Sequence, residues 1–277
     1  MFPYSNRVIL PISGFSLALL VFVTPALAQS GGAGDFLSAD KKGSAAANAL
    51  FDRKAPSKGG VKPPQGWSGK GSAGLVVSTG NTENNSVNLG LNVTYINDPW
   101  RHTVAATTYF AENNGEKEAE RYAISHKANY SMGDSGYVFN FLSYDSDEFA
   151  NIDSRLADVV GYGRNLIDTE KHNLDVELGV GYRQTRFTNN DPDSDETVGH
   201  AGLNYIGQIT PTTTLTENLL IQGGSDNIFT ESVTALSVKM TDKLSLSLNY
   251  TVRNNSEVAE GREKTDTVTS INLVTGF

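Results

Sequence analysis

The chain has 277 residues, no cysteine, a formal net charge of −9 and a mean hydropathy of −0.31. The lack of cysteine excludes a disulfide-stapled scaffold, and with only four histidines it also argues against a structural zinc site. Charge is uneven: residues 29–66 carry a net +3, whereas residues 67–277 carry 15 basic and 28 acidic residues, a net −13. A basic tail on an acidic body argues against nucleic-acid binding, which needs a basic face.

The first 28 residues have the order of a secretory signal peptide. Arg7 precedes an apolar run from Val8 to Val23, and Ala26-Leu27-Ala28 forms a small-x-small site. We therefore expect export and cleavage after Ala28. A transmembrane anchor is the alternative, but the run is too short and too interrupted to span a bilayer, which takes about 20 apolar residues.

Residues 29–66 are rich in Gly, Ala, Ser, Lys and Pro. This composition predicts a flexible periplasmic linker. From Trp67 the pattern changes to alternating apolar and polar residues, so we place a domain boundary there and expect residues 67–277 to form one domain.

Period-two alternation dominates this domain. Residues 87–95, 174–182 and 244–252 each place an aliphatic or tyrosine side chain at every second position. Such alternation predicts strands with one apolar and one polar face. Turn residues divide the region into about twelve strands, near 68–78, 84–96, 100–111, 120–131, 137–145, 155–165, 172–187, 196–209, 213–224, 228–240, 244–254 and 265–277.

The connections alternate in length. Tight turns at 97–99, 133–136, 210–212 and 241–243 contrast with long charged loops at 112–119, 146–154, 188–195 and 255–264. Short turns on one rim and long loops on the other are typical of an outer-membrane barrel. The tight turn Ser225-Asp226-Asn227 falls where a long loop is expected.

These patterns predict an all-β fold, an antiparallel transmembrane β-barrel of about twelve strands with a flexible N-terminal lead-in. A soluble β-sandwich or periplasmic β-repeat is the alternative, and it would need larger aliphatic clusters than this chain has. Apolar faces that are thin and mixed with Tyr, Thr and Ala favour a lipid-facing surface with aromatic girdles.

Several motifs of this region resemble one family. They are Trp67-Ser68-Gly69, Ser78-Thr79-Gly80-Asn81-Thr82, Tyr144-Asp145-x-Asp147-Glu148-Phe149 with Ile152 and Arg155, Gly161-Tyr162-Gly163, Gly179-x-Gly181-Tyr182-Arg183 and Lys264-Thr265-Asp266. Together they resemble the YdiY-like family (domain of unknown function 481), described as salt-induced outer-membrane proteins. The resemblance covers about residues 67–277 and implies an outer-membrane barrel, without catalytic or ligand residues to carry over.

The polar faces of the strands predict a charged interior. We expect Asp175, Glu177 and Arg183 to point inward, joined by Arg155, Arg164 and Arg253 from nearby strands. The glycines at 161, 163, 179 and 181 would share this face and admit bulky neighbours such as Tyr144 or Arg155. Such charges either pair into a network that plugs the lumen or form a constriction that selects solutes.

Two glutamates, Glu217 and Glu231, fit the predicted strand register poorly. The expected register puts Glu217 on the lipid face, where a carboxylate is unfavourable away from the interface, and Glu231 is also awkward. Either a bulge resets the register or Glu217 lies at the rim.

Candidate chemistry is sparse. Asp191-x-Asp193-x-Asp195-Glu196 has the carboxylate spacing of a calcium loop, but it lacks the glycine and the flanking helices of an EF-hand. Ser125 and His126 are adjacent, so on a strand they point to opposite faces and cannot act as a Ser–His pair. We expect no catalytic, cofactor-binding or metal residues and no cofactor.

The function that the sequence favours is a non-enzymatic outer-membrane barrel, either a narrow channel for small hydrophilic solutes or an envelope protein linked to osmotic or salt stress. The alternative is a structural or adhesion-type barrel with cation-binding acidic loops, and a lipid-modifying enzyme comes third. The expected partners are outer-membrane lipids and lipopolysaccharide, the barrel-assembly machinery, and small hydrophilic solutes or divalent cations.

The terminal Phe277 generates a first prediction. Ile271, Leu273 and Phe277 share one face of the expected last strand, interrupted by Thr275, an ending that assembly machinery can read. Deleting Phe277 should lower the outer-membrane level of the protein and raise degraded periplasmic material, measured by fractionation and immunoblotting. Unchanged membrane abundance would count against this signal.

Overall fold

The computed structural model describes residues 65–79, 84–113, 116–147, 152–188, 192–258 and 263–276. The expected signal peptide, nearly all of the expected linker and Phe277 lie outside these ranges. Among the described residues, no helix is long and apolar enough to cross a membrane.

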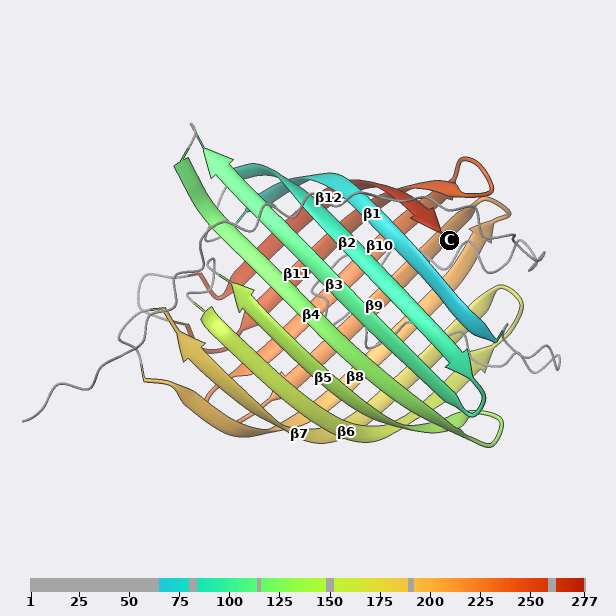
Figure 1. The fold of residues 1–277 in the computed structure, drawn as a ribbon, viewed down its shortest axis with the longest axis horizontal. Coiled ribbons are helices and arrows are strands. Elements are labelled where there is room, and N and C mark those ends of the chain that lie inside the picture. Colours follow the sequence, from blue (N-terminus) through green and yellow to red (C-terminus); the bar gives the residue numbers. More distant parts are fainter. Residues whose placement is uncertain are drawn as a thin grey trace, which may run out of the picture. The chain divides into compact units, whose positions relative to one another are not determined.

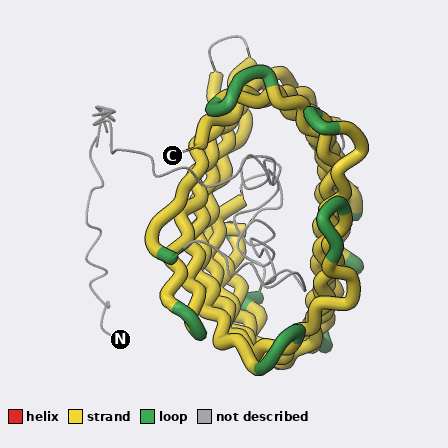
Figure 2. Tube along the Cα trace, turned by 90° about the vertical axis from the view of Figure 1, so that its right-hand side faces the viewer, coloured by secondary structure: helices red, strands yellow, loops and turns green. Residues whose placement is uncertain are grey.

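The described residues form twelve antiparallel strands that close into a barrel (Figures 1 and 2). In chain order they are β1 (Gly66–Thr79), β2 (Asn84–Asn97), β3 (Trp100–Asn113), β4 (Glu116–Met132), β5 (Gly136–Asp147), β6 (Ile152–Asp168), β7 (His172–Phe187), β8 (Ser194–Thr210), β9 (Thr213–Gly223), β10 (Ile228–Lys239), β11 (Leu244–Asn255) and β12 (Thr265–Gly276). Each strand pairs with its neighbours in sequence, and β1 pairs with β12 from Lys70↔Gly276 to Thr79↔Thr267. The predicted fold class and strand number are confirmed.

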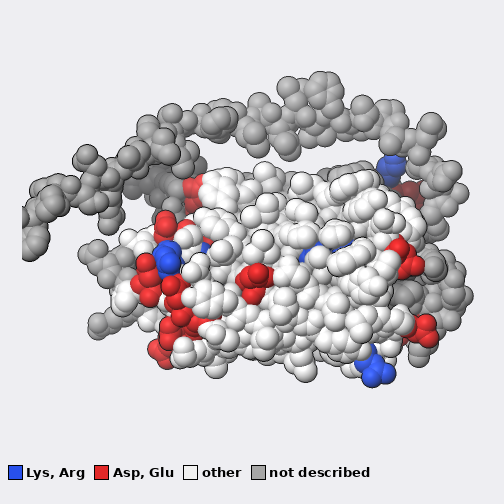
Figure 3. Space-filling model, turned by 60° about the horizontal axis from the view of Figure 1, so that its bottom comes forward, with Lys and Arg blue, Asp and Glu red and all other residues white. Residues whose placement is uncertain are grey.

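The outer face of the barrel is apolar and exposed. Leu89, Leu178, Val180 and Leu248 are between 46% and 71% exposed, as expected of side chains that contact lipid. Figure 3 shows a face on which charged side chains gather toward the ends and leave a largely uncharged belt between them, interrupted by an acidic spot.

Aromatic side chains lie on this outer face near the ends of the strands. At the rim of short turns, the ring of Trp67 lies 4.7 Å from that of Tyr95, and Trp100 lies 5.0 Å from Tyr130. Rings of this kind mark the two water–lipid boundaries of a transmembrane barrel.

Two expected loops are shorter than the sequence suggested. Residues 112–119 were expected to form a charged loop, but β3 continues to Asn113 and β4 begins at Glu116, with a register shift between Ala111 and Glu112. The strands likewise extend into the expected loop 146–154, as far as Asp147 and from Ile152. The backbone ladder therefore continues through charged segments that the sequence marked as loops.

Glu217 lies on the outer face, as the register predicted, but neither expected remedy applies. The β9–β10 ladder runs without a bulge, and Glu217 is in the middle of β9 rather than at its rim. Instead, the hydroxyls of Ser232 and Thr234 on β10 donate hydrogen bonds to its carboxylate at 2.6 and 2.5 Å. Glu231 faces the interior, where it is fully buried.

The glycines of β6 and β7 face the interior, as predicted, but Tyr144 does not lie beside them, because it is 44% exposed on the outer face. The aromatic neighbours are Phe139 and Tyr137 of β5, whose rings occupy the space that a Cβ at Gly161 or Gly163 would need. Glycine at these positions therefore makes room for buried rings.

This packing gives a prediction at Gly181, where a Cβ would lie 2.7 and 2.9 Å from Cγ2 and Cα of Val159 and closer still to the Asp158 carbonyl oxygen. The backbone cannot yield easily, so Gly181→Ala should lower the free energy of unfolding by about 1–3 kcal/mol. Urea unfolding in lipid vesicles, followed by tryptophan fluorescence, measures this. Gly71→Ala is the control, since nothing lies within 4 Å of its Cβ position, and an equal loss there would contradict the packing argument.

Candidate functional site

The inner face of the barrel carries buried charged side chains, which makes it the candidate site. Strict alternation along each strand sends one set of residues outward and the other inward. On β7 this places Asp175, Glu177 and Arg183 inside, all at most 2% exposed, as the sequence predicted. Arg155 and Arg253 also face inward, whereas Arg164 is exposed on the outer face, so its expected place in the lumen was wrong.

The first group of charges lies on β4, β5 and β6 near the rim of long loops. Asp145 and Arg155 are direct register partners on β5 and β6, and the guanidinium holds both carboxylate oxygens at 3.1 and 2.8 Å. Arg121 and Asp147, partners on β4 and β5, approach to 3.2 Å. Cross-strand register thus produces these pairs, which are the strong, two-pronged kind in the case of Asp145.

A second ion pair faces this group from the other side of the ring. Arg253 on β11 donates to its register partner Glu231 on β10 at 2.6 Å. Arg121 Nη1 lies 4.0 Å from Glu231 Oε2, and β4 and β10 are six strands apart in either direction around the ring. This contact, which we call the cross-lumen bridge, therefore connects opposite walls.

The cross-lumen bridge is reinforced by a ring contact. The guanidinium of Arg155 lies 4.6 Å from the ring centre of Phe229 on β10, within the range of a cation–π interaction. Three arginines and three carboxylates make up this level: Arg121, Arg155, Arg253, Asp145, Asp147 and Glu231. Asp266, the register partner of Arg253 on the inner face of β12, adds a fourth carboxylate to this level.

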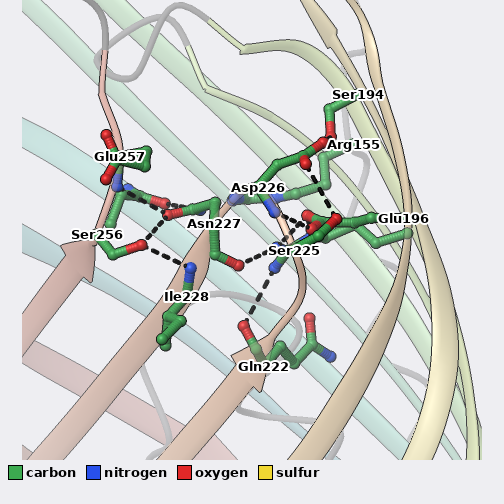
Figure 4. A network of polar contacts seen from close by, with 12 residues as sticks. Arg155, Ser194, Glu196, Gln222, Ser225, Asp226, Asn227, Ile228, Ser256 and Glu257 are labelled. Carbon is green, nitrogen blue, oxygen red and sulfur yellow. Dashed lines mark hydrogen bonds and ion pairs between the residues drawn. The ribbon is translucent and has the colours of Figure 1, made fainter.

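A further cluster holds the short turn between β9 and β10 (Figure 4). Arg183 donates to Glu196 at 3.0 Å and to the Asn227 carbonyl at 2.7 Å, and the backbone N–H of Asp226 donates to Glu196 at 2.9 Å. A Cβ at Gly224 would overlap the Glu196 carboxylate, so a larger residue there would force that side chain to move. The turn between β9 and β10 lies at the end of the barrel that carries the long loops, yet it is short. The buried side chains of Arg183 and Glu196 hold its backbone in place.

Asp226 in this turn also bonds to exposed neighbours. Hydrogen bonds from Ser194, at 2.6 Å, and Ser225 hold the pKa of the Asp226 carboxyl below its ordinary value. Because its pKa is lowered, Asp226 stays negatively charged, and keeps the hydrogen bonds from the two serines, at a more acidic pH than an ordinary aspartate would.

Closer to the rim of short turns lies a buried Lys–Glu pair. Lys127 on β4 donates to Glu177 on β7 at 2.7 Å, and the Tyr137 hydroxyl donates to the same carboxylate. The ammonium also lies 4.8 Å from the ring centre of Phe139, and His200 approaches Glu177 to 4.0 Å. Lys127 and Glu177 are each at most 2% exposed.

Apolar side chains fill the interior between the two charged levels. On β5 the inward order from the rim of short turns is Tyr137, Phe139, Phe141, Ser143 and Asp145. The cluster also contains Ala105, Ala123, Val159, Val198, Leu220 and Phe229. The half of the lumen lined by β4–β10 is therefore packed in layers, charged, apolar and charged.

The inner face of β8–β12 toward the short turns differs, because amides and hydroxyls line it. We call this surface the neutral wall: Asn204, Thr214, Thr216, Asn218, Ser237, Ser247, Asn249, Ser270 and Asn272, each at most 4% exposed. Ser237 and Ser247 bond at 2.9 Å, and Asn272 donates to Ser270 at 2.8 Å. This surface was not predicted from the sequence, although polar residues at every second position of β9 and β11 signal it.

The sequence candidates for chemistry do not assemble. Ser125 faces inward and His126 outward, where its ring stacks on that of His102 at 5.5 Å. Asp193 and Asp195 pair with Arg186, while Glu196 turns inward, and Asp191 lies outside the described residues. Among the described residues, no group of three or more His, Cys, Asp or Glu side chains could hold a metal ion.

A closed ring of antiparallel strands with an apolar exterior and a charged interior defines an outer-membrane β-barrel fold. The NanC porin has this fold with a TM-score of 0.52 and 14% identity, covering 74% of this chain and 98% of that one. An outer-membrane channel of Pseudomonas putida F1 gives 0.50 and 11%, covering 78% and 97%. At such identities the likeness concerns the fold alone.

The family follows from the sequence match. The model of the protein family of unknown function DUF481 matches residues 71–277, so the chain belongs to that family. It is 26% identical to the uncharacterized protein YdiY of Escherichia coli (strain K12) over 208 residues, 75% of this chain and 82% of that protein. The resemblance noted in the sequence motifs is thereby confirmed.

The buried Lys–Glu pair generates a prediction about stability. Lys127→Met leaves Glu177 buried without its cation and should lower the free energy of unfolding by about 3–5 kcal/mol. Adding Glu177→Leu removes the uncompensated charge, so the double variant should recover a large part of that loss. Urea unfolding in lipid vesicles tests this, and a double variant less stable than Lys127→Met would contradict it.

Proposed function

We propose that the protein is a non-enzymatic outer-membrane barrel that provides a narrow passage for small hydrophilic solutes, closed by the cross-lumen bridge. The precursor would be exported by residues 1–28, cleaved after Ala28, with residues 29–66 as a periplasmic linker and residues 67–277 as the barrel in contact with outer-membrane lipids. The fold supports the membrane setting, and the interior supports the passage.

The cross-lumen bridge carries the proposal. Buried ion pairs stabilise a protein no better than apolar packing of the same volume, and often less well. A barrel that served only as a rigid plug could fill this level with aliphatic side chains, as it does one layer below. Arginines and carboxylates on opposite walls instead offer a contact that water can replace, because each partner also keeps a neighbour on its own wall.

This arrangement gives the bridge two states. Arg121 can remain paired with Asp147 and Glu231 with Arg253 when the 4.0 Å contact between Arg121 and Glu231 opens. Parting of the walls then leaves no charge unpaired at that level and solvates the passage. Rising ionic strength favours the open state by screening the newly solvated charges, which connects the passage to osmotic and salt stress.

A structural or adhesion-type barrel with cation-binding acidic loops is the second candidate. The acidic side chains at the ends of the barrel favour it (Figure 3), and divalent cations could bridge them to lipopolysaccharide phosphates. Arg186 already engages Asp193 and Asp195 at 3.3 and 3.1 Å, which weakens the case for that loop as a cation site.

Planar-bilayer recording of the refolded protein tests the passage. Wild type should show small or infrequent openings. Arg121→Gln should increase the open fraction several-fold, because the ionic contact with Glu231 is lost, although the Arg155–Phe229 contact still joins the walls at this level. Arg186→Gln, which removes an exposed arginine pair at the rim, is the matched control and should behave as wild type. No conductance in any variant would overturn the passage and favour the structural barrel.

A further inference from the structure

The neutral wall contains buried polar groups that have no hydrogen-bond partner among the described residues. Asn204 on β8 and Asn218 on β9 are direct register partners, at most 1% exposed, and neither side-chain amide forms a hydrogen bond through its nitrogen or its oxygen. The hydroxyls of Thr214 and Thr216 on β9, at most 2% exposed, are likewise unpartnered.

Such a cluster needs an explanation, because each buried polar group without a partner costs about 1–3 kcal/mol. Buried polar groups in proteins are normally satisfied by protein, water or a ligand. Asn204, Asn218, Thr214 and Thr216 follow one another along the inner faces of two paired strands, so their unused donors and acceptors lie on one continuous surface. Their grouping indicates a place where polar groups from outside the protein are received.

The chemistry of the surface selects the kind of molecule. Amides and hydroxyls both donate and accept, which matches hydroxyl groups. The nearest buried charge is the carboxylate of Asp175, the register partner of Asn204 on β7, to which Asn165 donates a hydrogen bond at 3.2 Å. Along the inner faces of β9–β12, no charged side chain is described between the level of Glu231 and the Lys239 end of β10. An anionic solute would lose its hydration here and meet the Asp175 carboxylate, whereas a neutral or cationic hydroxylated solute would not be repelled.

We propose that the neutral wall binds a small polyhydroxylated solute of the sugar or polyol class that carries no negative charge, centred on Asn204 and Asn218. The inference deepens the proposed function, since such a molecule would be the solute that the passage admits. Binding itself requires access from the rim of short turns, not conduction through the whole barrel.

Three probes with the same carbon skeleton test the chemistry: D-glucose is neutral, D-gluconate is an anion and D-glucosamine is a cation. Saturation-transfer NMR and calorimetric titration of the full-length refolded protein in detergent micelles should show binding of D-glucose. D-gluconate should bind at least about tenfold more weakly than D-glucose, because its carboxylate would meet both Asp175 and neutral dipoles. D-glucosamine should bind at least as well as D-glucose. Equal binding of all three, or binding of none, would overturn the proposal and leave a hydrated wall.

Variants locate the site. Asn204→Leu combined with Asn218→Leu keeps the side-chain size and should lower the affinity for D-glucose at least about tenfold, the loss expected when hydrogen bonds to a substrate hydroxyl disappear. Asn92→Leu, at a half-buried inward position of β2 across the ring, is the matched control and should bind as wild type. An equal loss in Asn92→Leu would overturn the assignment.

A charge-introducing variant keeps the test valid if the leucines impair folding. Asn218→Asp should shift the preference further from D-glucose toward D-glucosamine, which a merely structural role of Asn218 would not do, and an unchanged preference would count against the site. If Arg121→Gln increases conductance while D-glucose does not bind, the passage stands and this inference fails. If D-glucose binds without conductance, the site stands and the passage fails.

Discussion

Closure of the β1–β12 ladder is the constraint on which the rest of the structure depends. In a bilayer, every backbone N–H and C=O must find a partner within the protein, so a sheet can cross only as a ring without edges. Once the ring closes, the period of two along each strand divides the side chains into two populations with different solvents. The outward side chains are mainly Leu, Val and Tyr, which suit contact with lipid. The inward side chains can be charged, although a charge would be unfavourable on the lipid-facing side.

Closure also explains how exceptions are accommodated. Glu217 sits on the outer face because its register leaves no choice, and shifting β9 by one residue would turn Asn218 and Thr216 toward lipid. The chain keeps the register and supplies two hydroxyls from β10 to the carboxylate. Local hydrogen bonding is evidently less costly than a bulge that would propagate through two ladders.

The fold could be predicted because its determinants are local. Alternation and turn residues predicted β7 at 172–187 and β11 within one residue of its bounds. The same alternation correctly predicted that Asp175, Glu177 and Arg183 face inward. Where charged residues continue a strand, as at Glu112–Asn113 and from Glu116 onward, their charge led to the wrong prediction of a loop. A strand that leaves the membrane keeps its ladder but loses its apolar signal.

The site could be predicted only in kind. Alternation along a strand predicts which charged side chains face the lumen. It does not predict which of them are in contact, because contact depends on the cross-section of the barrel and on the length of each side chain. Arg121 and Glu231 are 110 residues apart in the chain and six strands apart in the ring, and no sequence pattern links them. The same holds for the neutral wall, whose members become a surface only when β8 to β12 stand side by side.

The paired interior changes what the acidic sequence means. Although residues 67–277 carry a net −13, five basic side chains in the lumen pair with five carboxylates at the levels of Arg121, Lys127 and Arg183. The excess negative charge therefore acts mainly from the rims, over a Debye length of roughly 8 Å at physiological salt. Inside the rims these pairs offset one another, and the buried carboxylate of Asp175, the register partner of Asn204, lies beside the amides and hydroxyls of the neutral wall. If the proposed site is correct, the interior should therefore discriminate mainly against anions, because an anion would be repelled by the acidic rims and again by Asp175.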